Sequence, residues 1–395
     1  MPHILAQAIE IMTTALTVAG VAYFLASLLA ARIYLRERRA PKAAFSPGIS
    51  IIKSLKGLDP GMMDAFRCHC RQSYAGEFEL LFGVSSLDDP AIAAVNQLIA
   101  EFPERSILLV DCPERLGTNG KVSTLAQLAR HARYDILLIN DSDITVSPHY
   151  LEQVACCFAP AAQDPADAPV GLVTALYRGR AHGTLASRFE ALGISVDFIP
   201  AVLLSKLIER GLHYGLGSTL AVRREALEKA GGLLALVDQL ADDYEMGVRV
   251  AGADYRVALS TEVVETSVPA YAWRDFFEHQ LRWLRTVRDA RPAGYVGLIF
   301  THGLMWALLN VLASGLSPLS LWLLGLSFFL RLAQAMTVGA QVLGDHQVLP
   351  NLWLLPPRDA VAMGLWIAGF AGDTIVWRGE RFTLKDGRLV KIERS

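Results

Sequence analysis

Two pairs of aspartates have the spacing to bind a cation and to accept a proton. The first pair, Asp141 and Asp143, follows the branched apolar run 136–139, which predicts a short buried strand. Aspartates two residues apart at the end of a strand can turn toward one hard cation, whose other positions are open to phosphate oxygens and water. This pattern is typical of a Mg²⁺ or Mn²⁺ site for a nucleotide diphosphate, and it also occurs in solvated acidic turns.

The second pair, Asp242 and Asp243, opens a predicted helix after Gly231 and Gly232. Acidic residues are common in the first turn of a helix, where they interact with free N–H groups and with the helix dipole. The chemical alternative is that one of these carboxylates is a general base. The motif by itself is compatible with either role.

A glycine-containing segment, Gly117-Thr118-Asn119-Gly120-Lys121, precedes a helical pattern of apolar residues. Free N–H groups at a helix start, together with the positive charge of Lys121, favour a phosphate site. The segment is not a Walker A loop, because the spacing and the Ser or Thr after the lysine are missing. A surface turn with an exposed lysine is the structural alternative.

Short apolar runs alternate with helical patterns around these motifs. Strands are predicted at 48–56, 78–84, 106–110 and 136–139, with helices at 62–74, 91–102 and 121–132 between them. This β-α-β-α-β-α-β order predicts a parallel sheet covered on both faces, with its ligands at the strand ends that carry Asp88, Asp111, Lys121 and Asp141. Further strands are predicted at 170–177 and 220–222. Two later segments, 182–214 and 269–289, have helical spacing.

The composition indicates membrane segments. The chain has 395 residues, of which 52% are hydrophobic and 19% charged, and its mean hydropathy is +0.33, which is too apolar for an ordinary soluble enzyme. The net charge of −2 gives no reason to expect a nucleic-acid partner. The five cysteines form neither a zinc-type spacing nor an even disulfide set.

Hydrophobic runs predict where the chain crosses the membrane. Residues 11–31 carry no charge and supply about 20 apolar positions, enough for one spanning helix. The basic cluster that begins at Arg32 places the N-terminus outside and the following residues in the cytoplasm. The uncharged segment 292–330 predicts two spans with a reversal near Pro318, the second of them carrying Arg331. For 349–377 we expect an interfacial piece followed by a last short span, and part of 345–377 must lie in the interface if the basic tail is cytoplasmic.

In combination, the motifs resemble those of the membrane glycosyltransferases of family 21, the ceramide glucosyltransferases, and of the similar bacterial hopanoid glycosyltransferases. The resemblance covers nearly the whole chain. Two positions depart from the family pattern: Ser54 replaces a proline, and His279 stands where the family has Gln or Arg, with Gln280 one residue later. The matching segments, in chain order, are 53–57, Asp88 to Ile92, Gly117 to Lys121, Asp141 to Asp143, Gly215 to Ala221, Asp242 to Tyr244, Arg282-Trp283, and Trp377-Arg378 with the basic residues after it.

The resemblance implies an α/β fold of the GT-A type, a doubly covered mixed sheet with one N-terminal and several C-terminal transmembrane helices. The implied divisions are an anchor at 1–42, a catalytic domain at 43–290, transmembrane or interfacial helices at 291–377 and a basic tail at 378–395. The implied reaction moves glucose or N-acetylglucosamine from its UDP-sugar to a lipid hydroxyl, with inversion, at the cytoplasmic face of a membrane, such as the bacterial inner membrane. Mg²⁺ or Mn²⁺ would be the cofactor.

The resemblance also implies a role for each motif. Asp243 is the base, and Asp242 raises its pKa through like-charge repulsion. Asp141 and Asp143 hold the metal, Asp88 contacts the uridine or ribose, and Trp283 walls the acceptor side. The catalytic set is Asp242, Asp243, His279, Arg282 and Trp283, and the set that binds the nucleotide sugar is Lys56, Asp88, Asp89, Asn119, Lys121 and Gln280.

Other functions share parts of this pattern. A hopanoid polyol is the alternative acceptor to ceramide, and residues 291–295 look slightly more like the hopanoid branch. A processive polysaccharide synthase shares the aspartates and Arg282-Trp283, but it needs more spanning helices than the roughly four that this chain offers by the length rule. A non-catalytic nucleotide-sugar-binding membrane protein could lose Asp243, which is present here.

Overall fold

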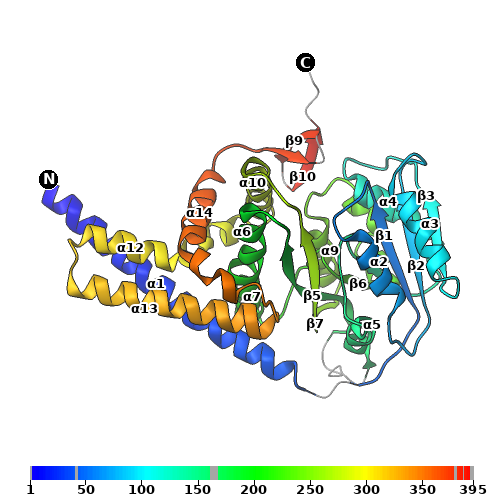
Figure 1. Ribbon diagram of the computed structural model, residues 1–395, viewed down its shortest axis with the longest axis horizontal. Helices are drawn as coiled ribbons and strands as arrows, with labels where there is room; N and C mark the ends of the chain where they lie inside the picture. The colour runs from blue at the N-terminus through cyan, green and yellow to red at the C-terminus, as the bar shows by residue number, and fades with distance from the viewer. Residues whose placement is uncertain (1, 41–42, 161–167, 378–379, 386, 392–395) are drawn as a thin grey trace.

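The fold has an α/β body at one end and a bundle of long helices at the other (Figure 1). The computed structural model describes residues 2–40, 43–160, 168–377, 380–385 and 387–391. The last strands of the chain lie beside the α/β body, far from the outer end of the bundle where the chain begins (Figure 1). Arg378, which belongs to a predicted motif, lies outside the described residues.

The body is built on one mixed sheet with the strand order β3-β2-β1-β4-β6-β5-β7. The first four strands are parallel, as their alternation with helices predicts, and β6 pairs antiparallel with both β4 and β5. β7 pairs parallel with β5 at one edge. The strands are β1 (Ile49–Leu55), β2 (Phe78–Val84), β3 (Ile107–Asp111), β4 (Ile136–Ile139), β5 (Val170–Ala181), β6 (Leu220–Arg223) and β7 (Arg256–Val268).

Helices cover the sheet on both faces. Alternate residues of the strands enter two separate buried clusters: Ile52 and Leu137 belong to one, and Ile51 and Leu138 to the other. This is the packing expected of strands that are buried on both faces. The expectation of a doubly covered mixed sheet is therefore confirmed. The covering helices are α2 (Met62–Cys70), α3 (Ala91–Glu101), α4 (Gly120–Leu128), α5 (Tyr150–Ala155), α8 (Arg224–Lys229) and α9 (Asp242–Gly252).

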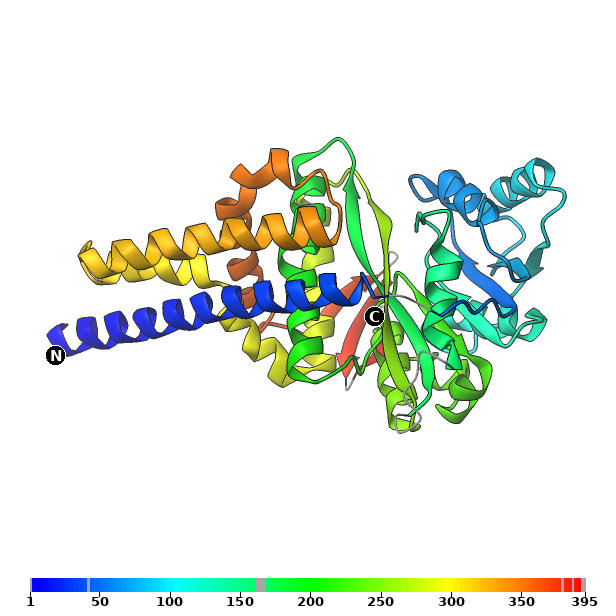
Figure 2. The same cartoon turned by 90° about the horizontal axis from the view of Figure 1, so that it is seen from below.

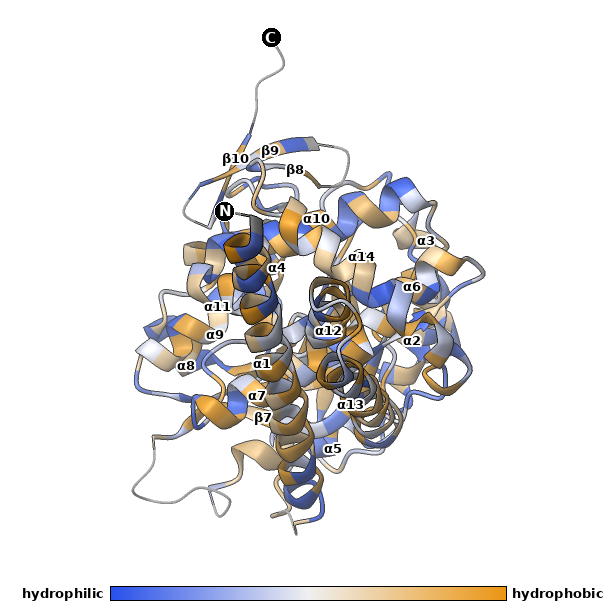
Figure 3. Cartoon of the chain, turned by 90° about the vertical axis from the view of Figure 1, so that its left-hand side faces the viewer, coloured by the Kyte–Doolittle hydropathy of each residue, from blue (hydrophilic) through white to orange (hydrophobic). Residues whose placement is uncertain are grey.

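Three long helices form the bundle, and Figure 2 shows them side by side. They are α1 (Pro2–Glu37), α12 (Gly303–Ala313) and α13 (Pro318–Gln334), and they are largely apolar in colour in Figure 3. A Cβ atom on Gly20 of α1 would lie 2.3 Å from the Cα atom of Gly303 of α12, so these helices cross in direct backbone contact. By length and composition, 3–37, 185–208 and 318–342 could each cross a membrane, as could the bent pair 292–301 and 303–313.

A layer of helices runs across the inner ends of the bundle, between the bundle and the sheet (Figure 1). It contains α6 (Leu185–Gly193), the π-helical turn η4 (Ile194–Phe198), α7 (Ile199–Ile208), α10 (Trp273–Ala290), the short α11 (Pro292–Gly297) and α14 (Leu355–Ala368). Segment 185–208 is apolar enough to span, yet in both Figure 1 and Figure 2 it runs across α1 and not alongside it. We therefore count it with the layer and not with the bundle.

The expected last short span before Trp377 is wrong. Helix α14 has 14 residues, which is about 21 Å of helix and less than the hydrocarbon core of about 30 Å. Residues 374–377 form a strand, β8 (Thr374–Trp377), which pairs with β9 (Glu380–Lys385), and β9 pairs with β10 (Arg388–Lys391). These strands lie beside the α/β body (Figure 1).

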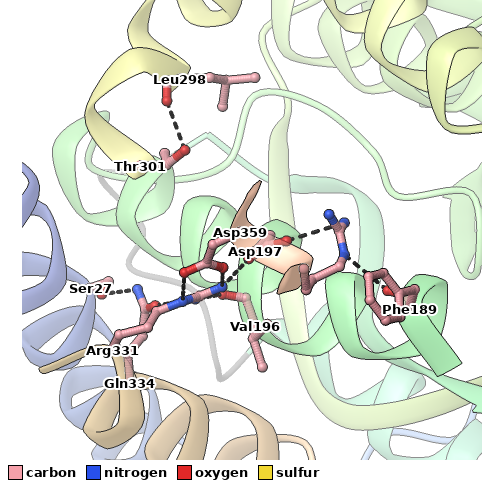
Figure 4. A network of polar contacts seen from close by, with 10 residues as sticks. Ser27, Phe189, Val196, Asp197, Leu298, Thr301, Arg331, Gln334 and Asp359 are labelled. Carbon is pink, nitrogen blue, oxygen red and sulfur yellow. Dashed lines mark hydrogen bonds and ion pairs between the residues drawn. The ribbon is translucent and has the colours of Figure 1, made fainter. Parts of the chain in front are cut away.

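Arg331 connects the bundle to the crosswise layer (Figure 4). Its guanidinium donates to both carboxylate oxygens of Asp359 on α14, at 3.0 and 2.5 Å, and to Asp197 of η4 at 2.5 Å. It also donates to Gln334, whose amide in turn donates to Ser27 of α1 at 2.6 Å. A charge within an apolar helix is costly unless it is paired. These contacts satisfy it and join four segments of the chain.

Replacing Arg331 with Met should destabilise the protein by about 3–5 kcal/mol, because the buried Asp359 then loses the cation that both of its oxygens contact. Asp197 keeps its ion pair with Arg358 at 3.2 Å. Thermal unfolding of the detergent-purified protein measures the loss. The double variant Arg331→Met/Asp359→Leu should recover part of it, since the second change removes the orphaned carboxylate. Equal midpoints for wild type and Arg331→Met would contradict this account.

Candidate active site

The two acidic motifs, a hundred residues apart in sequence, meet at Lys121. Its ammonium nitrogen lies 2.7 Å from Oδ1 of Asp141 and 3.8 Å from Oδ2 of Asp242. Burial lowers the pKa of Lys121, but the charges of Asp141 and Asp242 outweigh it and hold the pKa above its usual range. Lys121 therefore stays charged, and it offsets the repulsion between the two carboxylates.

Asn119 explains why Lys121 and Asp242 come together. Its side-chain oxygen accepts from the N–H of Val122 at 3.2 Å, which caps α4. Its amide donates to the carbonyl of Gln239 at 2.8 Å and to Oδ1 of Asp242 at 3.3 Å. The helix cap is thus also a bridge to the start of α9, and the fully buried Asn119 makes its contacts with the protein itself.

Asp141 and Asp143 differ in their surroundings. The side chain of Asp141 is 46% exposed, whereas Oδ2 of Asp143 accepts from Thr266 Oγ1 at 2.6 Å and from the N–H of Ser267 at 2.9 Å. Burial, and after it the charge of Asp141, raises the pKa of Asp143. β7, which supplies Thr266 and Ser267, has no counterpart among the predicted strands, because its polar and apolar residues do not alternate cleanly along an edge strand.

The donor chemistry at the end of β4 fits a hard cation. Carboxylate oxygens are ligands that Mg²⁺ and Mn²⁺ prefer. Within the part of the chain that the structure describes, no three His, Cys, Asp or Glu side chains are grouped to hold an ion. Asp141 and Asp143 would hold such an ion, and its remaining positions would be open to phosphate oxygens and water.

Asp243 lies against a glycine-rich turn. A Cβ atom on Gly217 would lie 2.9 Å from Oδ2 of Asp243, and one on Gly215 would lie 2.7 Å from the Asp243 carbonyl oxygen. Burial first, and the charge of Asp242 second, raise the pKa of Asp243 to about 6. A carboxylate with a pKa near 6 is well matched to accept a proton at neutral pH.

Lys53 and Asn140 contact each other and the backbone of Asp141. The sequence did not predict a role in the site for either residue. Lys53, fully buried in β1, donates to Asn140 Oδ1 at 2.5 Å and to the carbonyl of Asp141 at 2.9 Å. Burial lowers the pKa of Lys53 to about 8. The amide of Asn140 lies 3.0 Å from Nε2 of His69, whose Nδ1 faces the carbonyl of Ala65 at 2.7 Å. The sequence feature that could have indicated a role for Lys53 is its position as a charged residue within an apolar strand.

A pocket opens beside this cluster at the ends of β1 and β2. Lys56 and Lys121, both predicted to bind the nucleotide sugar, line it. Asp88 and Asp89 are absent from its lining; Asp89 instead accepts from the N–H groups of Gly57 at 3.0 Å and Ala91 at 2.9 Å. The described lining is Ser54, Leu55, Lys56, Ser85, Pro113, Glu114, Arg115, Thr118, Gly120, Lys121, Ser123, Thr124 and Phe382.

Glu190 of α6 organises the motif on α10 and was missed in the sequence. Its buried carboxylate lies 3.0 Å from Nδ1 of His279 and accepts from the amide of Gln280 at 3.3 Å. The ring of His279 lies 4.8 Å from that of Trp283. His279, where a departure from the family pattern was expected, thus places a ring nitrogen within hydrogen-bond distance of Glu190. A single glutamate within an apolar helical run gave no motif to recognise.

Tyr271 lies beside the motif on α10, with its ring centroid 5.6 Å from that of His279. Burial raises the pKa of Tyr271, with a further increase from Glu190 and Asp143 and a decrease from Arg282. The structure brings Lys56, Asn119, Lys121, Asp141, Asp143, Asp242 and Asp243 into one region, with Glu190, His279, Gln280, Arg282 and Trp283 at its side.

Comparison with known sequences decides the family. The sequence model of glycosyl transferase family 21 matches residues 12–390. The chain belongs to glycosyl transferase family 21. Ceramide glucosyltransferase 1 of Caenorhabditis elegans is 23% identical to it over 377 residues, which cover 92% of this chain and 77% of that protein. A ceramide glucosyltransferase of Candida albicans is 32% identical over 116 residues, which cover 27% of this chain and 21% of that protein.

A solved structure supports the GT-A expectation for this family 21 chain. The mannosyltransferase from Pyrobaculum calidifontis, solved in complex with GDP-Man and Mn²⁺, aligns with a TM-score of 0.52 at 20% sequence identity. The alignment covers 92% of this chain and 97% of that one. At this identity the likeness shows the fold, and the expected GT-A type α/β fold is confirmed.

Replacing Asp243 with Asn should stabilise the protein at pH 8 but not at pH 4. Its pKa of about 6 in the folded protein lies above the ordinary 3.8, so folding disfavours the charged form and wild-type stability falls as pH rises through 6. We expect the thermal midpoint to increase by roughly 2–4 °C at pH 8. Asp64→Asn, at an exposed aspartate on α2, is the control and should change neither midpoint. A loss of stability in Asp243→Asn at pH 8 would refute the account.

Proposed function

We propose that this family 21 glycosyltransferase moves a hexose, glucose or N-acetylglucosamine, from its UDP-sugar to the hydroxyl of a membrane lipid, with inversion at the anomeric carbon. The proposal rests on the contacts of Lys121 with Asp141, which follows the central strand β4, and with Asp242, which is next to Asp243 at the start of α9. The names of the relatives, ceramide glucosyltransferases, favour ceramide or a ceramide-like lipid as acceptor.

Asp243 would act as the general base. In a single displacement, the lipid hydroxyl attacks the anomeric carbon while its proton passes to the Asp243 carboxylate, and the bond to the diphosphate oxygen breaks. The pKa of about 6 leaves Asp243 ionised at neutral pH and still basic enough to accept the proton. The charge of Asp242 helps to raise the pKa of Asp243. In this proposal Asp243 accepts the proton, while Asp242 contacts Asn119 and Lys121.

Positive charge would assist the departing UDP. Lys121 pairs with Asp141 at 2.7 Å and lines the pocket together with Lys56, so both ammonium groups would face a bound diphosphate. Arg282 on α10 would supply a further positive charge for the diphosphate. Mg²⁺ or Mn²⁺ held by Asp141 and Asp143 would neutralise charge on the diphosphate when bound.

The layer of crosswise helices offers a place for the lipid acceptor. It lies between the bundle and the sheet, so a lipid in the membrane surface can present its hydroxyl near α10 without leaving the bilayer (Figure 1). The basic residues that follow α1 favour the cytoplasmic side for the α/β body. The described part of the chain has three candidate spans, or four with the bent pair, which suits transfer of one sugar better than export of a polymer.

The test is sugar transfer by the detergent-purified protein. UDP-glucose and UDP-N-acetylglucosamine are each offered to ceramide and to a hopanoid polyol, with Mn²⁺ or with EDTA. We expect a glycolipid product with one donor, a loss of more than about 100-fold with EDTA or with Asp243→Asn, and a rate that falls as pH drops through about 6, because Asp243 is then protonated.

The combination of UDP-sugar and lipid that yields a product identifies both substrates. The polyol arm decides between ceramide and the hopanoid alternative. Product from no pair, with UDP-sugar binding intact, would favour a nucleotide-sugar-binding protein without transfer. Activity in Asp243→Asn equal to wild type would remove Asp243 from the role of base.

Replacing Glu190 with Ala should slow transfer by about 10- to 100-fold in kcat while changing the KM for the UDP-sugar by less than about twofold. The reason is that Glu190 positions His279 and Gln280 on α10 and does not line the donor pocket. Glu190→Gln, which keeps an acceptor for His279, should recover part of the rate. Glu278→Ala, at an exposed position of α10, is the control, and equal losses in both helix variants would contradict a positioning role.

A further inference from the structure

The C-terminal sheet β8-β9-β10 is bound to the start of α9 by backbone hydrogen bonds. The N–H of Leu389 donates to the carbonyl of Asp238 at 2.9 Å, and the N–H of Leu240 donates to the carbonyl of Gly387 at 3.3 Å. The side chain of Asp289, on α10, accepts from the N–H of Gly387. The C-terminal sheet, called the tail sheet below, therefore contacts both the segment that precedes Asp242 and α10, the helix that carries Arg282.

The segment 237–240 also holds the loop that precedes α4. Oδ1 of Asp238 accepts from the N–H and the hydroxyl of Thr118 at 2.9 and 3.0 Å. The carbonyl of Val237 accepts from the N–H of Asn119 at 2.7 Å. The same four residues thus contact the proposed phosphate loop on one side and the tail sheet on the other.

Phe382 of β9 brings the tail sheet into the donor pocket. It is 2% exposed and packs in a small cluster with Leu240, Ile375, Leu384 and Leu389. It also lines the pocket that contains Lys56 and Lys121, and among the described lining residues it is the one that comes from beyond the α/β body. The pocket joins apolar surface from Leu55, Pro113 and Phe382 to cationic side chains, a combination that suits a flat base attached to a diphosphate.

We propose that the C-terminal sheet forms one wall of the donor site and that Phe382 contacts the nucleobase of a bound nucleoside diphosphate. This inference rests on the proposed function and extends it, since it assigns a donor-binding residue to the tail. The sheet is held against segment 237–240 and α10, so this wall is in place together with the phosphate loop and the base Asp243. Loss of an aromatic contact of this kind weakens binding by about three- to tenfold.

The test is UDP binding to the full-length, detergent-purified protein, measured by isothermal titration calorimetry with Mn²⁺ present. Phe382→Leu keeps the cluster filled but removes the ring, and we expect its Kd to rise by about three- to tenfold. Leu389→Ala removes a side chain of the same cluster that does not line the pocket. It should change the Kd by less than about twofold. Amide hydrogen exchange in 380–391 should slow when UDP is added to the wild type.

The outcomes separate this inference from the function on which it rests. An unchanged Kd in Phe382→Leu, or an equal rise in both variants, would overturn the contact between Phe382 and the base while leaving sugar transfer intact. Wild-type protein that does not bind UDP would overturn the proposed function itself, and the contact between Phe382 and the base with it. A selective rise in Phe382→Leu supports the inference.

Discussion

The salt bridges from Lys121 to Asp141 and Asp242 are the contacts on which the rest of the site depends. Carboxylates that approach one another at a partly buried sheet edge repel, and each would raise the pKa of the next unless a cation lies between them. Lys121 and Asn119 both belong to the start of α4, so one helix cap positions the cation and binds Asp242. Asp243 makes no such pair with Lys121, and burial together with the charge of Asp242 raises its pKa.

Segment 185–208 couples this edge to the membrane bundle. Glu190 near its start holds His279 and Gln280, and Asp197 in its π-helical turn pairs with Arg331 of α13. A π-turn rotates the following residues relative to a regular helix, and here it lies between the carboxylate that faces α10 and the helix that packs on α1. The position of the Arg282-Trp283 motif therefore depends on buried polar contacts with the helices expected to span the membrane.

The sequence predicted those parts of the site that local chemistry reveals. Strand ends, glycine turns and helix starts have short-range signatures, so the order of β1 to β4 and the residues at their ends could be inferred. Glu190 and Lys53 could not be assigned in this way, because a single charge in an apolar run has meaning only through its partner. Helix α14 was expected in part to cross the membrane, since apolar composition does not distinguish a helix that spans from one that lies across other helices.

By itself the sequence determined the family, the alternating strands and helices, and which acidic and basic residues exist to be brought together. The tertiary structure decided the pairings: Lys121 between Asp141 and Asp242, Asp143 against β7, and Phe382 of the last strands beside a pocket built by the first. Apart from the contact between Lys121 and Asp141, these contacts join residues more than one hundred positions apart, and no local pattern encodes them. They arise when the sheet order and the packing of helices are set, because burying charged groups is favourable only where a partner from another segment is already in place.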